Sequence, residues 1–277
     1  MIMRSGFLAA LFAALGLAVP AAAQTPPPAG KPEMREGCPG MVAAATPRVM
    51  PASLRLAALA TDQVRITFIG HATFLIESPK LVRIATDYND YVKPPLVPDI
   101  ATMNHAHSTH YTDHVDPAIK YVLRGWRDDG TPASHDLTFG DVHVRSVATN
   151  IRNWSGGTER YGNSIFIFEV GSLCVAHLGH LHHTLNQQQL DEMGRVDVVL
   201  IPVDGSYTLD VDGMIEVLES LKAPLMIPMH YFSSYGLDRF VERLRGKYPV
   251  EFNETPSVVV SRATLPASPK LLVLPGR

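Results

Sequence analysis

Short strand-like segments that end in histidine or aspartate constrain the fold of this chain most strongly. His71 follows the run VRITFIG, Asp87 ends LVRIATD, His180 follows SLCVAHLG and His230 follows LMIPM. A fifth run, ending at Met103, leads directly into NHAHSTHYTDHVD. Taken singly, each histidine would more simply be a hydrogen-bonded structural residue. Together they favour strands whose ends meet at one edge and build a pocket there.

The order of the segments predicts the fold class. Residues 62–103 are mostly strand-like, whereas the last third of the chain alternates strands with the helical patterns LNQQQLDEMG, VDGMIEVLESLK and LDRFVERLRGKY. Asp116 followed by Pro117 predicts a further helix over 117–126. Two sheets with helices outside, an α/β (α+β) fold of the αββα sandwich type over 62–277, is the architecture that we expect.

The first 61 residues predict export. An apolar run followed by AAAQ is typical of a secretory signal peptide over 1–23, and 24–61 has the composition of a flexible Pro/Ala-rich leader. The apolar run is shorter than the ~20 residues of a spanning helix, so no stable membrane insertion is expected after cleavage; an uncleaved anchor is the alternative. In a periplasmic or secreted protein Cys38 and Cys174 could pair, with a free buried Cys174 as the other possibility.

Composition narrows the partners. With 46% hydrophobic and 18% charged residues the chain is globular, and a formal net charge of -3 without a basic run predicts no nucleic-acid partner. A small-molecule substrate is expected. Nothing in the composition specifies an oligomeric state.

The stretch NHAHSTHYTDHVD holds four histidines within ten residues. His105 and His107 are two apart after an extended run, so in a strand they would point the same way. His110 follows three residues later, a spacing that one tight turn brings onto the same side. Neutral imidazole is the commonest metal-ligating side chain, so this spacing favours a metal site. A solvated, histidine-rich loop is the alternative.

Five motifs in order, GHATFLIES, the strand ending at Asp87, HAHSTH, HLGHLHH and IPMHY, resemble the metallo-β-lactamase superfamily. The nearest resemblance is to the branch that includes ascorbate-phosphate lactonase and N-acyl phosphatidylethanolamine phospholipase relatives. The resemblance implies the metallo-β-lactamase fold, a site for one or two metal ions, commonly zinc, and hydrolysis by a metal-bound hydroxide.

The signature His-x-His-x-Asp-His of this family falls on His105, His107, Thr109 and His110. Its aspartate, which normally orients the attacking water, is therefore replaced by Thr109. A threonine can hydrogen-bond but cannot accept a proton, so a general base must come from His71, Asp113 or an unligated histidine. Asp87 is better interpreted as the acceptor that fixes a ligand imidazole.

Two further ligand positions depart from the family pattern. The bridging aspartate falls on His180 and a histidine expected near Asn150 is missing, whereas the late histidine falls on His230. Nearly all ligands are then neutral imidazoles, which compensate a second cation poorly and favour one ion or an asymmetric pair. Such a set suits zinc, copper, nickel or iron better than magnesium or calcium.

The sequence therefore predicts an exported, metal-dependent hydrolase that acts on an ester, lactone, amide or phosphodiester. A non-hydrolytic protein on the same fold, which binds a metal or ligand at a degenerate site, is the alternative. A β-lactamase in the antibiotic sense has only export and fold analogy in its favour.

Overall fold

The computed structural model describes residues 58–153, 155–231 and 233–276. These residues belong to one compact unit, 55–277. The predicted signal peptide, all but the last four residues of the predicted leader, and Cys38 lie outside the described residues. Cys174 has no disulfide partner among the residues that are described.

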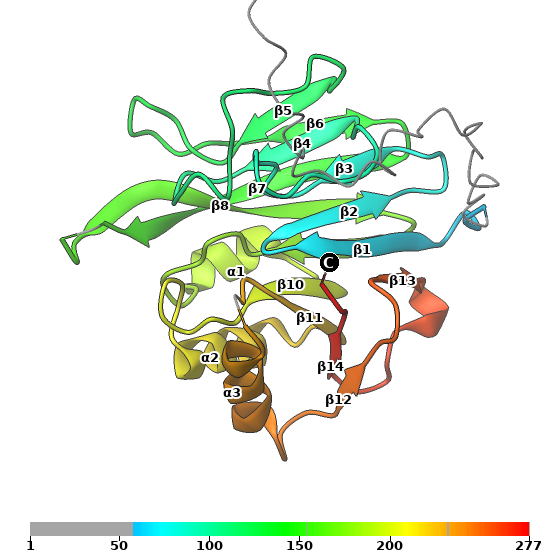
Figure 1. The fold of residues 1–277 in the computed structure, drawn as a ribbon, viewed down its shortest axis with the longest axis vertical. Coiled ribbons are helices and arrows are strands. Elements are labelled where there is room, and N and C mark those ends of the chain that lie inside the picture. The colour runs from blue at the N-terminus through cyan, green and yellow to red at the C-terminus, as the bar shows by residue number, and fades with distance from the viewer. Residues whose placement is uncertain (1–57, 154, 232, 277) are drawn as a thin grey trace, which may run out of the picture. The chain divides into compact units, whose positions relative to one another are not determined.

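The first sheet has six strands in the order β13-β1-β2-β3-β4-β5 (Figure 1). Their bounds are β1 Val64–Gly70, β2 Thr73–Glu77, β3 Arg83–Ala85, β4 Ile100–Met103, β5 Tyr121–Arg124 and β13 Ser257–Val260. The pairs of β13, β1, β2 and β3 are antiparallel, whereas β3, β4 and β5 run parallel. The parallel strands carry the histidine-rich loop at their ends.

The second sheet has eight strands in the order β12-β14-β11-β10-β9-β8-β7-β6. Their bounds are β6 Asp136–Phe139, β7 Val142–Arg152, β8 Thr158–Val170, β9 Leu173–His177, β10 Val198–Pro202, β11 Leu225–Met229, β12 Val250–Phe252 and β14 Lys270–Val273. Strands β9, β10, β11, β14 and β12 are parallel, so β9, β10 and β11 end at one edge of this sheet.

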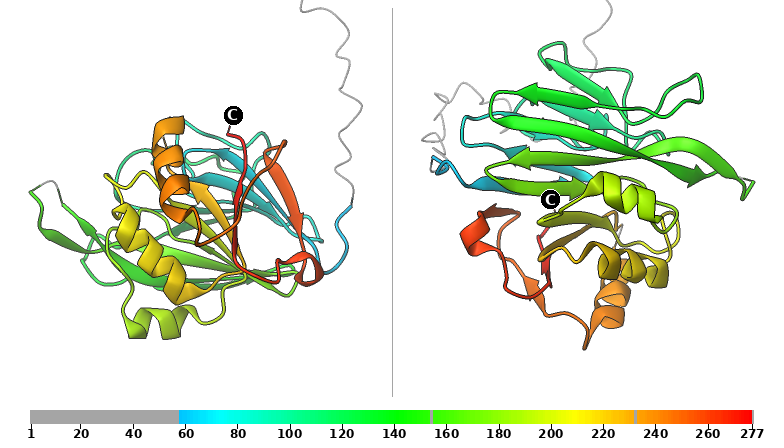
Figure 2. Two further views of the ribbon diagram at one scale, coloured as in Figure 1. Left: turned by 90° about the horizontal axis from the view of Figure 1, so that it is seen from below. Right: turned by 180° about the vertical axis from the view of Figure 1, so that it is seen from behind.

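Three helices, α1 Gln187–Met193, α2 Val211–Leu221 and α3 Ser234–Leu244, pack on the outer face of the second sheet (Figures 1 and 2). The side chains of Asn186 and Asp210 cap the first turns of α1 and α2 by accepting backbone N–H groups. A 3₁₀ turn, η2 Arg262–Thr264, precedes β14. No helix within the described residues has the length and apolar character needed to cross a membrane.

Strict alternation along the strands builds the layers. Phe166 and Phe168 of β8 enter the core between the two sheets, whereas Ile165 and Ile167 enter the core beneath the helices. Successive side chains of a strand point to opposite faces, so the run SIFIFEV serves both cores at once. The predicted α/β sandwich of the metallo-β-lactamase type is confirmed.

The predicted helix over 117–126 is wrong. Asp116 does cap a turn, because its carboxylate accepts the N–H of Ala118 and its carbonyl accepts that of Ile119. The chain then pairs with β4 as strand β5. Ile119 and Trp126 instead pack in a small cluster on the outer face of the first sheet. Asp116 therefore caps a single turn instead of a helix, because the residues that follow pair with β4 as a strand.

Candidate metal centre

Side chains from both sheets converge at the edge where β1, β3, β4, β9, β10 and β11 end. His71 and His230 follow β1 and β11 directly, Asp87 lies two residues beyond the end of β3, and the backbones of His71, Asp87 and His230 are left-handed, with φ of 51°, 41° and 56°. Such a conformation costs a non-glycine residue about 1–3 kcal/mol, and it persists only where the surroundings enforce it. Here the N–H of His230 donates to the carbonyl of His71 over 2.7 Å, which joins the two sheets at the site.

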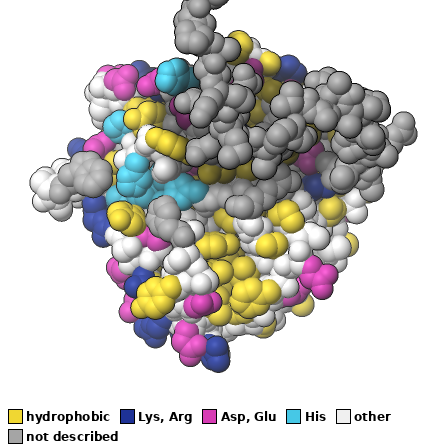
Figure 3. All heavy atoms as spheres, viewed as in Figure 1, with side chains coloured by type: hydrophobic (Ala, Val, Ile, Leu, Met, Phe, Trp, Pro, Cys, Tyr) yellow, Lys and Arg dark blue, Asp and Glu magenta, His cyan; other side chains and the backbone are white. Residues whose placement is uncertain are grey.

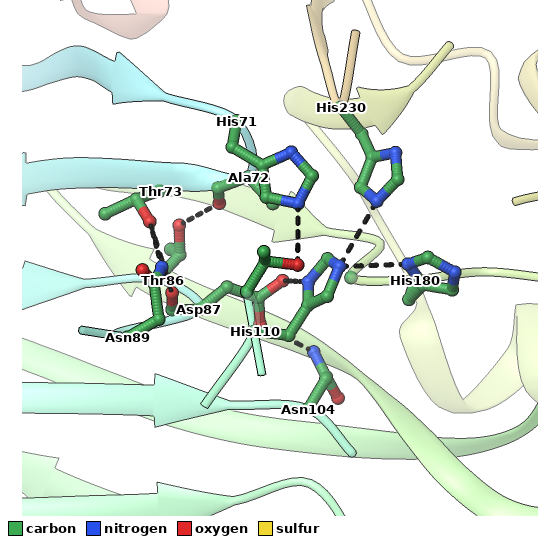
Figure 4. Close-up of polar contacts among 12 residues, drawn as sticks. His71, Ala72, Thr73, Thr86, Asp87, Asn89, Asn104, His110, His180 and His230 are labelled. Atoms are coloured by element: carbon green, nitrogen blue, oxygen red, sulfur yellow. Dashed lines mark hydrogen bonds and ion pairs between the residues drawn. The ribbon is translucent and has the colours of Figure 1, made fainter. Parts of the chain in front are cut away.

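Four imidazoles form the centre of the site: His107, His110, His180 and His230. One ring nitrogen of each lies within 4.8 Å of the corresponding nitrogens of the other three. Nε2 of His110 lies 3.2 Å from Nε2 of His230 and 2.9 Å from Nδ1 of His180 (Figure 4). Tetrahedral zinc with Zn–N bonds of about 2.0–2.1 Å places its nitrogens roughly 3.3 Å apart, so the spacing fits one ion.

Two carboxylates fix the proton positions on this cluster. Asp87 Oδ2 lies 2.6 Å from Nδ1 of His110, and Asp204 Oδ1 lies 3.0 Å from Nδ1 of His230. A carboxylate only accepts, so both Nδ1 atoms carry a proton, which leaves a lone pair on Nε2 of each ring in its neutral form. The two Nε2 atoms face each other across 3.2 Å. A cation between them would be bound by both nitrogens.

Burial and charge also favour a cation. Burial raises the pKa of Asp87 to about 6, so it is largely ionised at neutral pH. Burial alone would raise the pKa of Asp204, but hydrogen bonds from His230 and Thr208 hold it well below its usual range. Within the described residues, histidine is the one basic side chain that lies within 4.0 Å of either carboxylate. Arg239 donates to the backbone carbonyl of Asp204 and not to its carboxylate.

Three of the four imidazoles have a lowered pKa. Burial lowers the pKa of His110 and His180 well below the ordinary value, and neighbouring imidazoles lower it further. Burial also lowers the pKa of His107. Two buried carboxylates among imidazoles of lowered pKa carry negative charge that a divalent cation would offset.

Two buried amide side chains, those of Asn104 and Asn163, hydrogen-bond to groups at the cluster. Asn104 donates from Nδ2 to Asp87 Oδ1 over 2.9 Å and accepts the N–H of Ser164 over 2.8 Å. Asn163 Oδ1 accepts the N–H of His180 over 2.8 Å. Gly179 lies between the two amides with φ of 61°, and a Cβ there would approach both to 2.4 Å. Sequence reasoning missed this network; Asn104, the first residue of the histidine-rich stretch, was its one visible sign.

His71 lies beside the cluster. Its Nε2 lies 3.1 Å from Thr109 Oγ1, and its ring centroid lies 4.3 Å from that of His230. Burial, with help from His230 and His107, lowers the pKa of His71 to about 3. A base with so low a pKa accepts protons poorly at neutral pH. His71 and Thr109 are therefore hydrogen-bonding groups at the edge of the cluster.

Two of the predicted site residues lie outside the cluster, and their assignments need correction. His105 Nδ1 lies 3.1 Å from Glu159 Oε1, and its ring packs 5.1 Å from that of Trp126. The alternation that would align it with His107 fails, because β4 ends at Met103. Asp113 forms an ion pair with Arg124 over 3.1 Å and its side chain is 73% exposed, so it is no base for this cluster.

Asp204 is the functional group that the sequence left undecided. The stretch DGSY after DVVLIPV predicts either a loop at the rim of the site or an ordinary turn. The structure shows both, because Asp204 Oδ2 accepts the N–H groups of Ser206 and Tyr207 while Oδ1 holds His230. Its place directly beyond a buried strand is the signal that could have identified it.

Two further histidines are structural. His177 Nε2 donates to the carbonyl of Ala72 over 2.9 Å in the core, as its position inside a strand predicts. His143 lies 2.8 Å from Asp136 and 3.2 Å from Glu169, and these hydrogen bonds raise its pKa.

A cavity of about 470 Å³ opens beside the cluster. Histidine side chains form a patch on the molecular face shown in Figure 3. The residues that line the cavity include His105, His107, Tyr111, Glu159, His182 and Tyr207. Its volume is typical of small-molecule pockets. His107 is the one cluster member that borders it.

Comparison with known proteins agrees with this geometry. The sequence model described as the β-lactamase superfamily domain matches residues 65–230. A metal-dependent hydrolase of Thermoplasma volcanium is 30% identical over 190 residues, covering 61% of this chain and 83% of the relative. Its counterpart in Thermoplasma acidophilum is 28% identical over 192 residues, covering 61% and 84%.

Solved structures give the same picture. A candidate Zn-dependent hydrolase of the metallo-β-lactamase superfamily from Thermotoga maritima superposes with a TM-score of 0.56 and 28% identity, covering 77% of this chain and 100% of that one. A metallo hydrolase of Ignicoccus hospitalis shares the fold, with a TM-score of 0.50 and 18% identity over 67% and 91% of the chains. The predicted superfamily is confirmed, and the narrower branch stays a prediction.

Proposed function

Because this chain belongs to the β-lactamase superfamily domain family and is a metal-dependent hydrolase of that fold, we propose that the four-histidine cluster is its metal centre. The proposed ligands are His107, His110, His180 and His230. The proposed substrate is a small ester, lactone, amide or phosphodiester that enters through the cavity beside His107.

One observation carries the proposal. Asp87 and Asp204 each bond to the outer nitrogen, Nδ1, of His110 and His230, so that the inner Nε2 atoms face each other at 3.2 Å. Carboxylates that orient metal-ligating imidazoles in this way are usual around zinc.

A bound zinc ion would lower the pKa of a water molecule to about 7 and polarise the bond to be cleaved. Burial lowers the pKa of His107, His110 and His180, and the carboxylates of Asp87 and Asp204 would align two ligands and offset charge of the ion. Thr109 and His71, hydrogen-bonded to each other at 3.1 Å, supply a hydroxyl and an imidazole at the edge of the site. We propose that they orient water or substrate there.

We propose zinc, and one ion. Four nitrogen donors and no carboxylate oxygen make up the converging set, a combination that suits borderline-soft transition metals. The diversion of His105 to Glu159 leaves no second group of ligands beside the first among the described residues. Export to the periplasm or beyond is also our proposal, on the signal-like sequence of residues 1–23.

A second candidate function rests on the number of ligands. Four imidazoles complete a tetrahedral ion, and closed sites are characteristic of structural zinc, whereas catalytic zinc keeps an open position. Thr109 in place of a carboxylate points the same way. On this hypothesis the protein binds metal without turnover.

Elemental analysis of purified protein, followed by a panel of ester, lactone, amide and phosphodiester substrates with and without chelator, separates these functions. We expect about one equivalent of zinc and chelator-sensitive hydrolysis of one substrate class. Metal well below half an equivalent would remove the basis of the proposal. Stoichiometric metal without any chelator-sensitive turnover would favour the second candidate.

A further inference from the structure

We propose that His107 is a displaceable fourth ligand, which closes the metal centre at rest and yields its position to a donor atom entering from the cavity. This inference rests on the proposed function, because it concerns the same ion. It reconciles a complete set of four imidazoles with a hydrolase that needs an open coordination position.

The four histidines differ in how deeply they are buried. His110 and His230 are fully buried, and each has a carboxylate on its outer nitrogen at 2.6 Å and 3.0 Å. His180 is also fully buried, and its backbone N–H is held by Asn163 over 2.8 Å. His107 alone is only partly buried.

His107 also differs in position. It lines the cavity of about 470 Å³, together with Tyr111 and Tyr207. Its segment lies beyond the end of β4, in a turn closed by the N–H of His110 donating to the carbonyl of His107 over 2.8 Å. His230 instead follows strand β11 directly, and the N–H of His180 donates to the buried amide of Asn163.

The exchange is balanced. The bond between metal and His107 nitrogen would break as a bond between metal and an oxygen or nitrogen donor of the incoming molecule formed. His107 would leave as a neutral imidazole, so no proton or electron would be transferred. The three remaining ligands match the number that catalytic zinc sites keep.

Cobalt substitution and azide binding test the inference without relying on activity. In the wild-type protein we expect Co²⁺ with the intense visible absorption of four-coordinate cobalt and weak azide binding. In His107→Ala we expect retained cobalt, weaker bands from a solvent-filled position, and azide affinity raised by about tenfold or more. His230→Ala, which removes a firmly held ligand, should lose cobalt at the same free metal concentration.

His105→Ala is the matched control, since it removes an imidazole two residues away that is paired with Glu159 and lies outside the cluster. Its cobalt spectrum should equal that of the wild type. Identical spectra and azide affinities for wild type and His107→Ala would overturn the inference, as would loss of cobalt from His107→Ala to the extent seen in His230→Ala. A wild-type protein that binds neither zinc nor cobalt would overturn the metal centre itself, and this inference with it.

Discussion

Replacing Asp87 with asparagine should weaken zinc binding while leaving the fold intact. Asp87 accepts two hydrogen bonds, one from His110 Nδ1 at 2.6 Å and one from Asn104 Nδ2 at 2.9 Å. Asparagine of the same size has one acceptor oxygen, so one of these two buried donors would face an amide N–H instead. The tautomer of His110 would then no longer be fixed with its lone pair toward the metal.

The magnitude follows from two independent estimates. A hydrogen bond to a charged group is worth about 1.5–3 kcal/mol. Substituting the outer partner of a ligating histidine typically weakens metal affinity by about 10- to 100-fold, which is roughly 1.4–2.8 kcal/mol. The estimates agree, and we expect the zinc dissociation constant of Asp87→Asn to rise within that range.

Competition between the metal-free protein and a chromophoric chelator measures the change. Asp141→Asn is the matched control, because Asp141 also accepts two hydrogen bonds, from Ser78 Oγ at 2.6 Å and from the N–H of Lys80 at 3.0 Å. It lies between β6 and β7, outside the histidine cluster. The control should bind zinc as the wild type does.

A double-mutant cycle tests whether Asp87 affects zinc binding through His110. If Asp87 acts through His110, then adding Asp87→Asn to His110→Ala should weaken zinc binding little beyond His110→Ala alone. Fully additive losses would show that Asp87 acts by another route. Zinc affinity of Asp87→Asn within about threefold of wild type would refute the role assigned to the carboxylate.

Three further outcomes are expected. Gly179→Ala should lower the free energy of unfolding by about 1–3 kcal/mol and weaken zinc binding. The backbone of Gly179 is left-handed, and the added Cβ would lie 2.4 Å from the side chains of Asn104 and Asn163. Unchanged denaturation and metal titrations would contradict this packing argument. His143→Gln should lower the free energy of unfolding by at most about 1 kcal/mol below pH 6.5. Because carboxylate neighbours raise the pKa of His143 in the folded state, this loss should vanish as the pH rises through that pKa. A loss in urea titrations that does not depend on pH would argue against this role of His143. Removing the metal with chelator should lower the unfolding temperature, and re-adding zinc should restore it; an unfolding temperature that ignores zinc would speak against a metal shared by both sheets.

The sequence predicted the strands well because each is a short alternating or fully apolar run between breaks. It placed His180 and His230 at the same edge as His110, because parallel strands that end together put their following residues together. Strands β12, β13 and β14 were missed, since three or four residues give too short a pattern.

The sequence predicted where the site residues lie better than it predicted which way their side chains point. Alternation predicts that His105 and His107 point the same way only if the strand continues, and β4 stops at Met103. The acceptor role of Asp204 depends on how its own loop folds back onto β11, which residue spacing does not encode. The contact between Asn104 and Asp87 joins residues whose pairing depends on the packing of two strand ends.

The hydrogen bond from His230 to the carbonyl of His71 links the ends of β11 and β1, which belong to different sheets. His110 comes from the edge of the first sheet and His180 from the edge of the second, so the four nitrogens meet only when the two sheets are correctly placed against each other. The affinity for metal would thus depend on how the two sheets pack. Core substitutions far from the cluster that change the spacing between the sheets by a fraction of a bond length would therefore lower the affinity for metal before they affected the strands themselves.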